Sequence, residues 1–159
     1  MYRNNLIAWA LSVCLIALMP TAGTAQTDKV KASMAALKAE TAKLGAPKVE
    51  GSDLYFGKTK VSNDLVDTVH KKHGGAATLF VKNGKEYVRV ATTVKKENGS
   101  RAVGIPLDAN SSALGMLNTG EAYYGDATVF GKTYDAGYEP IKDASGAVIG
   151  AYFVGHKKK

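Results

Sequence analysis

The sequence predicts an α+β domain in which helices pack against one antiparallel sheet. Three patterns indicate this fold: an amphipathic stretch near the N-terminus, two β-prone runs joined by Asn83-Gly84, and three further β-prone stretches before the C-terminus. Strands separated by short turns pair antiparallel, and about five of them form a sheet large enough to be stable. With 159 residues, the chain suffices for one domain with a core of its own.

The N-terminal residues have the features of a secretory signal peptide. A basic residue precedes an apolar run over residues 6–19, and small residues follow up to Ala25. We therefore expect a signal peptide over residues 1–25 and a periplasmic domain over residues 26–159. Cys14 is the only cysteine and lies inside the apolar run, so the processed chain has no thiol. A lipid anchor at Cys14 is a weaker match, because valine precedes it where that site needs a small residue.

The processed chain is moderately basic. The 21 Lys and Arg residues fall to 20 without Arg3, against 14 Asp and Glu residues, which leaves a net charge of +6. This charge suits an anionic ligand, an acidic partner or a membrane surface, but lysine-rich helices and the terminal residues 157–159 also explain it. Nucleic acid is not an expected partner, because the basic residues are scattered among acidic ones.

The first expected element is a long N-terminal helix within residues 26–45. It begins at a Thr27-Asp28 cap and ends near Leu44, where Gly45 and Pro47 stop it. Its apolar positions recur at helical spacing and form one stripe, which we expect to pack on the sheet. The stripe consists of Val30, Met34, Leu37, Thr41 and Leu44.

Turn and cap residues delimit the remaining elements. The expected order is a short strand or hairpin over 54–61, a helix over 64–73, the central hairpin, a strand over 101–107, a helix over 110–118, and strands over 121–130, 133–141 and 148–154.

The central hairpin has two different faces. Asn-Gly is a strong two-residue turn signal, and placing it at 83–84 pairs Phe80 with Tyr87 and Leu79 with Val88. One face then carries Leu79, Val81, Val88 and Val90, and the other carries Thr78, Phe80, Tyr87, Arg89 and Thr93. A guanidinium is costly to bury without a partner, so the second face is interpreted as a binding surface.

Short blocks in a fixed order carry a resemblance to a known family. The chain resembles the single Cache domains, of the Cache 3/Cache 2 fusion type, which are sensor modules of bacterial chemoreceptors and sensor kinases. It departs from them at Thr93, at Ile105 and at residues 110–112, and it ends at Lys159 without a second membrane span. The blocks are residues 75–80, 87–92, 101–104 with Leu107, 120–127, 134–143 and 146–150.

This resemblance implies a PAS-like antiparallel sheet with the long helix on one face and a ligand pocket on the other. It also implies periplasmic sensing of small metabolites, often carboxylates or amines, in signal transduction and chemotaxis. Because the chain ends at Lys159, we expect a membrane receptor or sensor kinase to provide the output.

Arg89 is the first candidate for binding an anionic metabolite, because a guanidinium holds a carboxylate by two parallel hydrogen bonds. A structural ion pair or a carbonyl clamp is the alternative role. Arg101 is a second candidate, although an exposed arginine after a turn explains it as well. Aromatic residues supply walls and hydroxyl donors or, alternatively, pack in the core. They are Phe80, Tyr87, Tyr124, Tyr134 and Tyr138.

No catalytic residue, metal site or cofactor is expected. Nucleophile, phosphate-loop and zinc-protease motifs are missing, and the pair of His70 and His73 suits the end of a helix without further ligands. The sequence therefore predicts a non-enzymatic sensory module that binds a small carboxylate-type metabolite. Two alternatives remain: an interaction or dimerisation module, including a homodimer through the N-terminal helix, and an uncharacterised enzyme.

Overall fold

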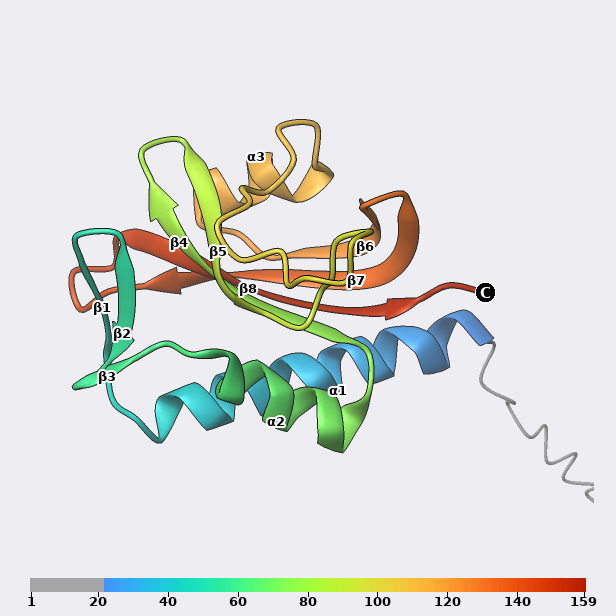
Figure 1. Cartoon of the computed structure of the whole chain (residues 1–159), viewed down its shortest axis with the longest axis horizontal. Coiled ribbons are helices and arrows are strands. Elements are labelled where there is room, and N and C mark those ends of the chain that lie inside the picture. Colours follow the sequence, from blue (N-terminus) through green and yellow to red (C-terminus); the bar gives the residue numbers. More distant parts are fainter. Residues whose placement is uncertain (1–21) are drawn as a thin grey trace, which may run out of the picture.

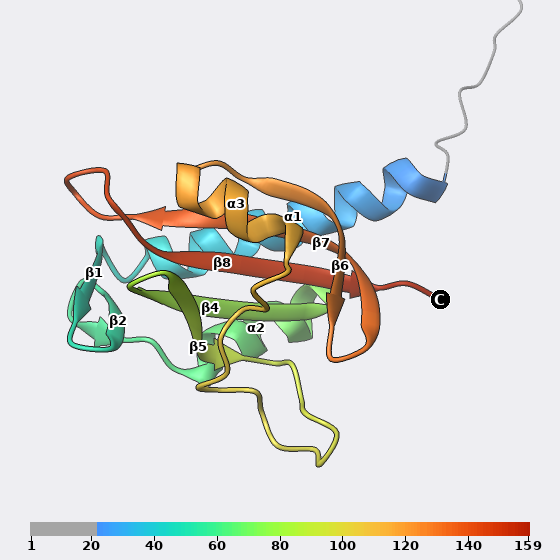
Figure 2. The same ribbon diagram turned by 90° about the horizontal axis from the view of Figure 1, so that it is seen from above.

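The computed structural model describes residues 22–159, with side chains from Thr27 onward. The main sheet has five strands in the order β5-β4-β8-β7-β6, and a second sheet has the order β1-β2-β3 (Figures 1 and 2). Every strand pair is antiparallel, so the predicted α+β class is confirmed. The helices are α1 (Ala22–Ala42), α2 (Asn63–His73) and α3 (Ser112–Thr119). The strands are β1 (Pro47–Glu50), β2 (Asp53–Phe56), β3 (Thr59–Lys60), β4 (Ala76–Asn83), β5 (Glu86–Thr92), β6 (Tyr123–Val129), β7 (Lys132–Lys142) and β8 (Val148–Lys157).

Helices α1 and α2 lie side by side along one face of the main sheet (Figure 1). The predicted stripe of α1 faces the sheet, where Val30, Met34 and Leu37 are at most 1% exposed. Burying each such side chain contributes about 1.5–3 kcal/mol, so packing rather than intrinsic propensity holds this helix in place. The hydroxyl of Thr41 is also buried and donates to the backbone oxygens of Leu37 and Lys38.

The two faces of the main sheet belong to two separate cores. Leu79 and Val81 of β4 join the core under α1 and α2. Phe80 of the same strand joins a second core on the opposite face, under α3. Alternation along a strand sends successive side chains to opposite faces, so one strand supplies both cores.

The central hairpin forms with a register that differs from the predicted one. Asn83 pairs with Glu86 and Phe80 pairs with Arg89, so the turn lies at residues 84–85 rather than 83–84. The shift leaves the predicted faces intact near the turn, because every partner moves by two positions. A β-bulge at Val90 then changes the alternation, and it places Thr92 rather than Thr93 beside Thr78.

Several predicted boundaries are corrected. Helix α1 runs through the expected Thr27-Asp28 cap and begins at Ala22. Strand β1 is not expected from the sequence, where Pro47 indicates the end of a helix, but proline also occurs as the first residue of a strand. Residues 101–107 form isolated bridges rather than a strand, since Gly104 has a φ of +81° and Pro106 has no N–H to donate.

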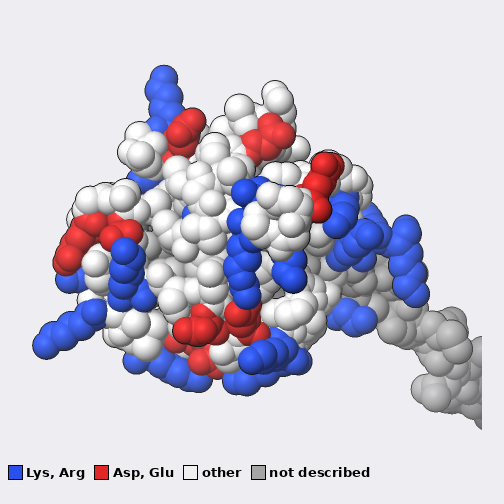
Figure 3. Space-filling view, in the orientation of Figure 1, with Lys and Arg blue, Asp and Glu red and all other residues white. Residues whose placement is uncertain are grey.

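The predicted signal peptide lies almost entirely outside the described residues. Within residues 22–159, no helix is both long enough and apolar enough to cross a membrane. Figure 3 shows basic and acidic side chains interleaved on the viewed face. Ion pairs such as Lys38 with Glu139 and Lys72 with Glu40 join some of these charges.

Candidate ligand pocket

Arg89 of β5 is a buried cation without an anion beside it. Only 5% of its surface is exposed, and within residues 22–159 no carboxylate forms an ion pair with it. Its Nη1 donates to the backbone oxygens of Ile105 and Pro106 at 3.0 and 2.7 Å. The guanidinium carbon lies 5.1 Å from the ring centre of Phe80 and 5.5 Å from that of Phe130, where the ring faces attract a cation.

The hydrogen bonds of Arg89 leave one edge of the guanidinium without partners among the described residues. Both backbone oxygens are bonded to Nη1, and Nε is buried without any hydrogen-bond partner. The N–H groups of Nε and Nη2 point the same way along the other edge, which is the arrangement that two carboxylate oxygens accept. An unpaired buried donor costs about 1–3 kcal/mol, so the protein maintains this edge at the expense of stability.

A cavity of about 320 Å³ lies beside Arg89 on the second face of the sheet. This volume is at the small end of the range typical of ligand sites. Its apolar walls come from Ile105, Leu107, Phe130 and Tyr138, and its hydroxyl groups from Ser111 and Thr128.

Tyr138 of β7 is a second unpaired donor in the same cavity. The residue is 1% exposed, and its ring packs against Phe153 at 4.8 Å and Tyr123 at 6.2 Å between centroids. Its hydroxyl makes no hydrogen bond to any of the described residues. Burial raises the pKa of Tyr138 despite the opposing effect of Arg89, so the phenol stays protonated and can donate.

Burial lowers the pKa of Arg89, while the neighbouring Tyr138 has a smaller effect in the opposite direction. The ordinary pKa of a guanidinium is so high that the group remains charged at neutral pH. The cavity therefore contains a permanent positive charge and a neutral phenolic donor. Together they can hold an anion with at least two oxygens.

The segment between β5 and α3, residues 93–111, forms one wall of the cavity. It follows the free edge of β5, where Gly104 N donates to the oxygen of Arg89 and Leu107 N donates to the oxygen of Tyr87. The backbone N–H of Arg89 in turn donates to the backbone oxygen of Ile105 at 3.2 Å. Both the backbone and the side chain of Arg89 therefore fix the position of this wall.

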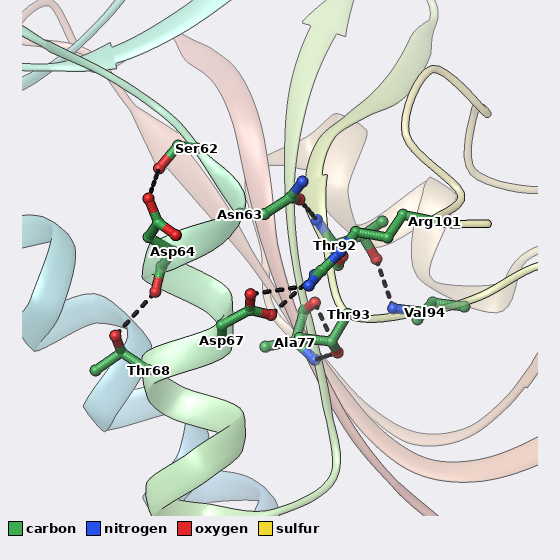
Figure 4. Close-up of polar contacts among 10 residues, drawn as sticks. All are labelled: Ser62, Asn63, Asp64, Asp67, Thr68, Ala77, Thr92, Thr93, Val94 and Arg101. Atoms are coloured by element: carbon green, nitrogen blue, oxygen red, sulfur yellow. Dashed lines mark hydrogen bonds and ion pairs between the residues drawn. The ribbon is translucent and has the colours of Figure 1, made fainter. Parts of the chain in front are cut away.

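Arg101 holds the same segment to α2 at a point away from the cavity. Its Nη1 and Nη2 each donate to Asp67 at 2.8 Å, and Nη1 also donates to the oxygen of Thr92 at 2.8 Å (Figure 4). The hydrogen bond from Arg101 lowers the pKa of Asp67. The guanidinium is thus occupied by a carboxylate and a carbonyl of the protein itself, and Arg101 is not brought to the pocket.

Tyr124 lies on the opposite face of the sheet from Arg89. In β6 it pairs with Gly137, and its ring packs against the core under α1. Its hydroxyl donates to Glu139 at 2.5 Å, and Glu139 also accepts from Lys38 of α1 at 2.6 Å. Burial would raise the pKa of Glu139, but these two hydrogen bonds outweigh it and lower the value.

The other aromatic candidates are divided between the pocket and the core. Phe80 lies in the second core, where its ring contacts the Arg89 guanidinium. Tyr87 is fully buried in the second core, with its hydroxyl 3.4 Å from Asn118. Tyr134 is on the same face but packs edge-on against Phe153, near the start of β7, and lines a different hollow. The structure thus brings Arg89, Phe80 and Tyr138 together and leaves Arg101, Tyr124 and Tyr134 elsewhere.

Sequence reasoning missed the pocket residues that come from turns and loops. Phe130 lies in the β6–β7 turn, has a φ of +47° and is 41% exposed, yet it contacts Arg89. A large aromatic residue beside Gly131 in a turn was the available signal, because such a side chain normally lies in a strand. The backbone oxygens of Ile105 and Pro106 have no signal in the sequence.

Within residues 22–159, no three potential metal-ligating side chains come together. His70 contacts the backbone oxygen of Gly75 through Nδ1, at 2.5 Å. His156 lies 3.0 Å from the hydroxyl of Ser33 on α1. Both imidazoles thus have protein partners.

Comparison with known proteins agrees with this architecture. The sensor domain of DcuS from E. coli, a solved structure, matches with a TM-score of 0.50 and 14% sequence identity, over 83% of this chain and 88% of that one. At this identity the likeness concerns the fold, which is PAS-like. No curated protein matches the chain. The family model described as the Cache 3/Cache 2 fusion domain matches residues 21–159, and the chain therefore belongs to this family of extracellular sensory modules.

Proposed function

We propose that this domain binds a small carboxylate-containing metabolite in the cavity beside Arg89 and transmits the binding event to a membrane protein. The observation that carries the proposal is a buried guanidinium with one unpaired edge next to a cavity. The unpaired edge contributes nothing to stability, and unpaired buried polar groups are concentrated at functional sites.

The groups around Arg89 determine which edge of its guanidinium a ligand can contact. Phe80 and Phe130 offer their rings to it, and the oxygens of Ile105 and Pro106 occupy Nη1. A carboxylate is best accommodated in the plane of the guanidinium, on the edge that contains Nε. The hydroxyl of Tyr138, which has no partner among the described residues, is available as a further donor.

Such a site can provide useful affinity for a small molecule. For a ligand of roughly six heavy atoms, the ceiling of about −1.5 kcal/mol per atom allows ~−9 kcal/mol. That value corresponds to a dissociation constant in the micromolar range or below. The proposal therefore needs no large interface.

A continuous set of contacts leads from the cavity to α1. Arg89 holds the segment 93–111, and Arg101 in that segment holds Asp67 of α2 (Figure 4). In α2, Lys72 forms an ion pair with Glu40 of α1. A ligand that binds Arg89 would change the contact between this arginine and the segment 93–111. Helix α1 is then the element through which a partner, such as a membrane receptor or sensor kinase, would detect the change. In this proposal the domain is exported and works in the periplasm.

The direct test is a thermal-shift screen of the purified protein against carboxylates, amino acids, amines and purines. A ligand at a hundredfold excess over its dissociation constant stabilises the folded state by about 2.7 kcal/mol, which is readily measured. We expect carboxylates to raise the melting temperature and neutral analogues to leave it unchanged.

Two variants locate the site in this screen. Arg89→Lys keeps the charge but loses the parallel donors, so we expect carboxylate binding to weaken strongly. Tyr124→Phe changes a tyrosine on the opposite face and serves as the matched control. If a folded Arg89→Lys protein binds every active compound as tightly as the unmodified protein, this cavity is not the site. If no compound binds but a receptor or a second copy does, the interaction-module alternative is correct.

A further inference from the structure

The cavity has a positive side chain in its buried part and a negative side chain at its exposed rim. Among the described residues that line it, Arg89 and Asp108 are the only charged ones. Arg89 is buried, whereas Asp108 is exposed. A ligand that fills the cavity therefore has a positive charge near one part of it and a negative charge near another.

The position of Asp108 is fixed from both sides. On its N-terminal side, Leu107 is buried and donates its N–H to the oxygen of Tyr87 in β5. On its C-terminal side, the Asp108 Oδ1 accepts from Asn110 N at 2.8 Å, two residues before α3 begins. Its second carboxylate oxygen, Oδ2, has no hydrogen-bond partner among the described residues.

A second hollow, of about 240 Å³, adjoins the cavity and shares Asp108, Ser111 and Thr128 with it. Its only other charged lining residue within the described chain is Asp126. That carboxylate is paired with Lys158, so its charge is already compensated. Asp108, by contrast, forms no ion pair in residues 22–159. Two observations thus coincide: an unpaired buried cation that lines the cavity, and an unpaired carboxylate at its rim.

Resting on the proposed function, we infer that the ligand is an amino carboxylate, a zwitterion whose carboxylate contacts Arg89 and whose ammonium group lies near Asp108. A monocarboxylate pairs only with the positive charge of Arg89 and leaves Asp108 unpaired. A dicarboxylate places its second negative charge near Asp108, where no other cation lines the described part of the cavity to compensate it. A simple amine leaves the Arg89 edge unpaired.

The test compares probes that differ in one group. Calorimetry is carried out with 2-aminobutyrate, 4-aminobutyrate, butyrate, succinate and butylamine, at one pH near 7 and at low salt. We expect at least one aminobutyrate to bind more tightly than butyrate and succinate, by roughly two- to fivefold, because Asp108 is exposed and an exposed ion pair is worth little. The difference should shrink when salt is added.

Asp108→Asn keeps an oxygen that accepts from Asn110 N and removes only the charge. We expect this variant to lose the preference for aminobutyrate and to bind succinate relatively better. Glu50→Gln, which changes an exposed glutamate of the small sheet that pairs with Lys48, is the control and should leave the order of affinities unchanged.

The outcomes separate this inference from the proposal on which it rests. Equal binding of butyrate and both aminobutyrates overturns the zwitterion inference and leaves carboxylate binding intact. The same conclusion follows if Asp108→Asn leaves the order of affinities as it was. If none of these probes and no other carboxylate binds, the proposed function fails and the inference fails with it.

Discussion

Replacing Arg89 by methionine should separate ligand binding from stability. Methionine has a similar length and no charge, so it can occupy the space between Phe80 and the 93–111 segment. The substitution removes two charge-assisted hydrogen bonds, worth about 1.5–3 kcal/mol each. It also removes two ring contacts, worth about 0.5–2 kcal/mol each.

The same substitution relieves two costs. Desolvation of a buried cation costs several kcal/mol even after relaxation, and the unpaired Nε adds about 1–3 kcal/mol. Gains and losses are of similar size. We therefore expect the free energy of unfolding of Arg89→Met to stay within about 2 kcal/mol of the unmodified protein, while carboxylate binding is lost.

Urea unfolding followed by circular dichroism measures the stability, since the only tryptophan is Trp9 in the predicted signal peptide. Arg101→Met is the matched comparison. That variant leaves Asp67 and the oxygen of Thr92 without their partner, so we expect a loss of about 1–3 kcal/mol with ligand binding retained. A loss above about 4 kcal/mol for Arg89→Met would show that its guanidinium is a structural clamp, and the reasoning on the unpaired edge would fail.

Three further predictions concern Tyr138, two glycines and His156. Tyr138→Phe should weaken carboxylate binding about tenfold by removing a hydroxyl donor, whereas Tyr124→Phe should leave affinity unchanged in calorimetry; equal effects would contradict the assignment of faces. Gly150→Ala places a Cβ 2.2 Å from a backbone oxygen of β4 and should cost about 3 kcal/mol or more in urea unfolding, while Gly115→Ala, in open space on α3, should be neutral or stabilising by up to about 1 kcal/mol. Burial lowers the pKa of His156 from its ordinary 6.5, so folding should lose stability as pH falls through and below about 6.5; His156→Gln should flatten this part of the stability profile, and an unchanged profile would refute the point.

Periodicity was sufficient to predict the sheet, the order of most elements and the face on which Arg89 lies. The face assignment survived an error in the turn, because moving a strand by two positions returns each side chain to the same side. Thr93 was misplaced because nothing in its sequence marks the bulge at Val90. A single extra residue reverses the alternation beyond it.

The site was only partly predictable for a related reason. Tyr123 and Tyr124 are consecutive tyrosines, so the sequence does not show which of them faces the second core. The pairing of Tyr123 with Tyr138 in the structure shows that it is Tyr123. Arg101 could not be assigned from the sequence, since its partner Asp67 lies 34 residues away on α2. The wall of the cavity depends on backbone oxygens of an irregular segment, and side-chain patterns do not encode those positions.

The bulge at Val90 has a mechanical consequence for the strand beside the cavity. A regular ladder resists displacement because moving one residue strains every bond along it, but an unpaired residue takes up a small movement locally. Val90 follows directly after Arg89, so the ligand that we propose for this arginine would act next to the interruption in the ladder. The strand can then shift on the cavity side of Val90 while Ala91 and Thr92 keep their partners in β4.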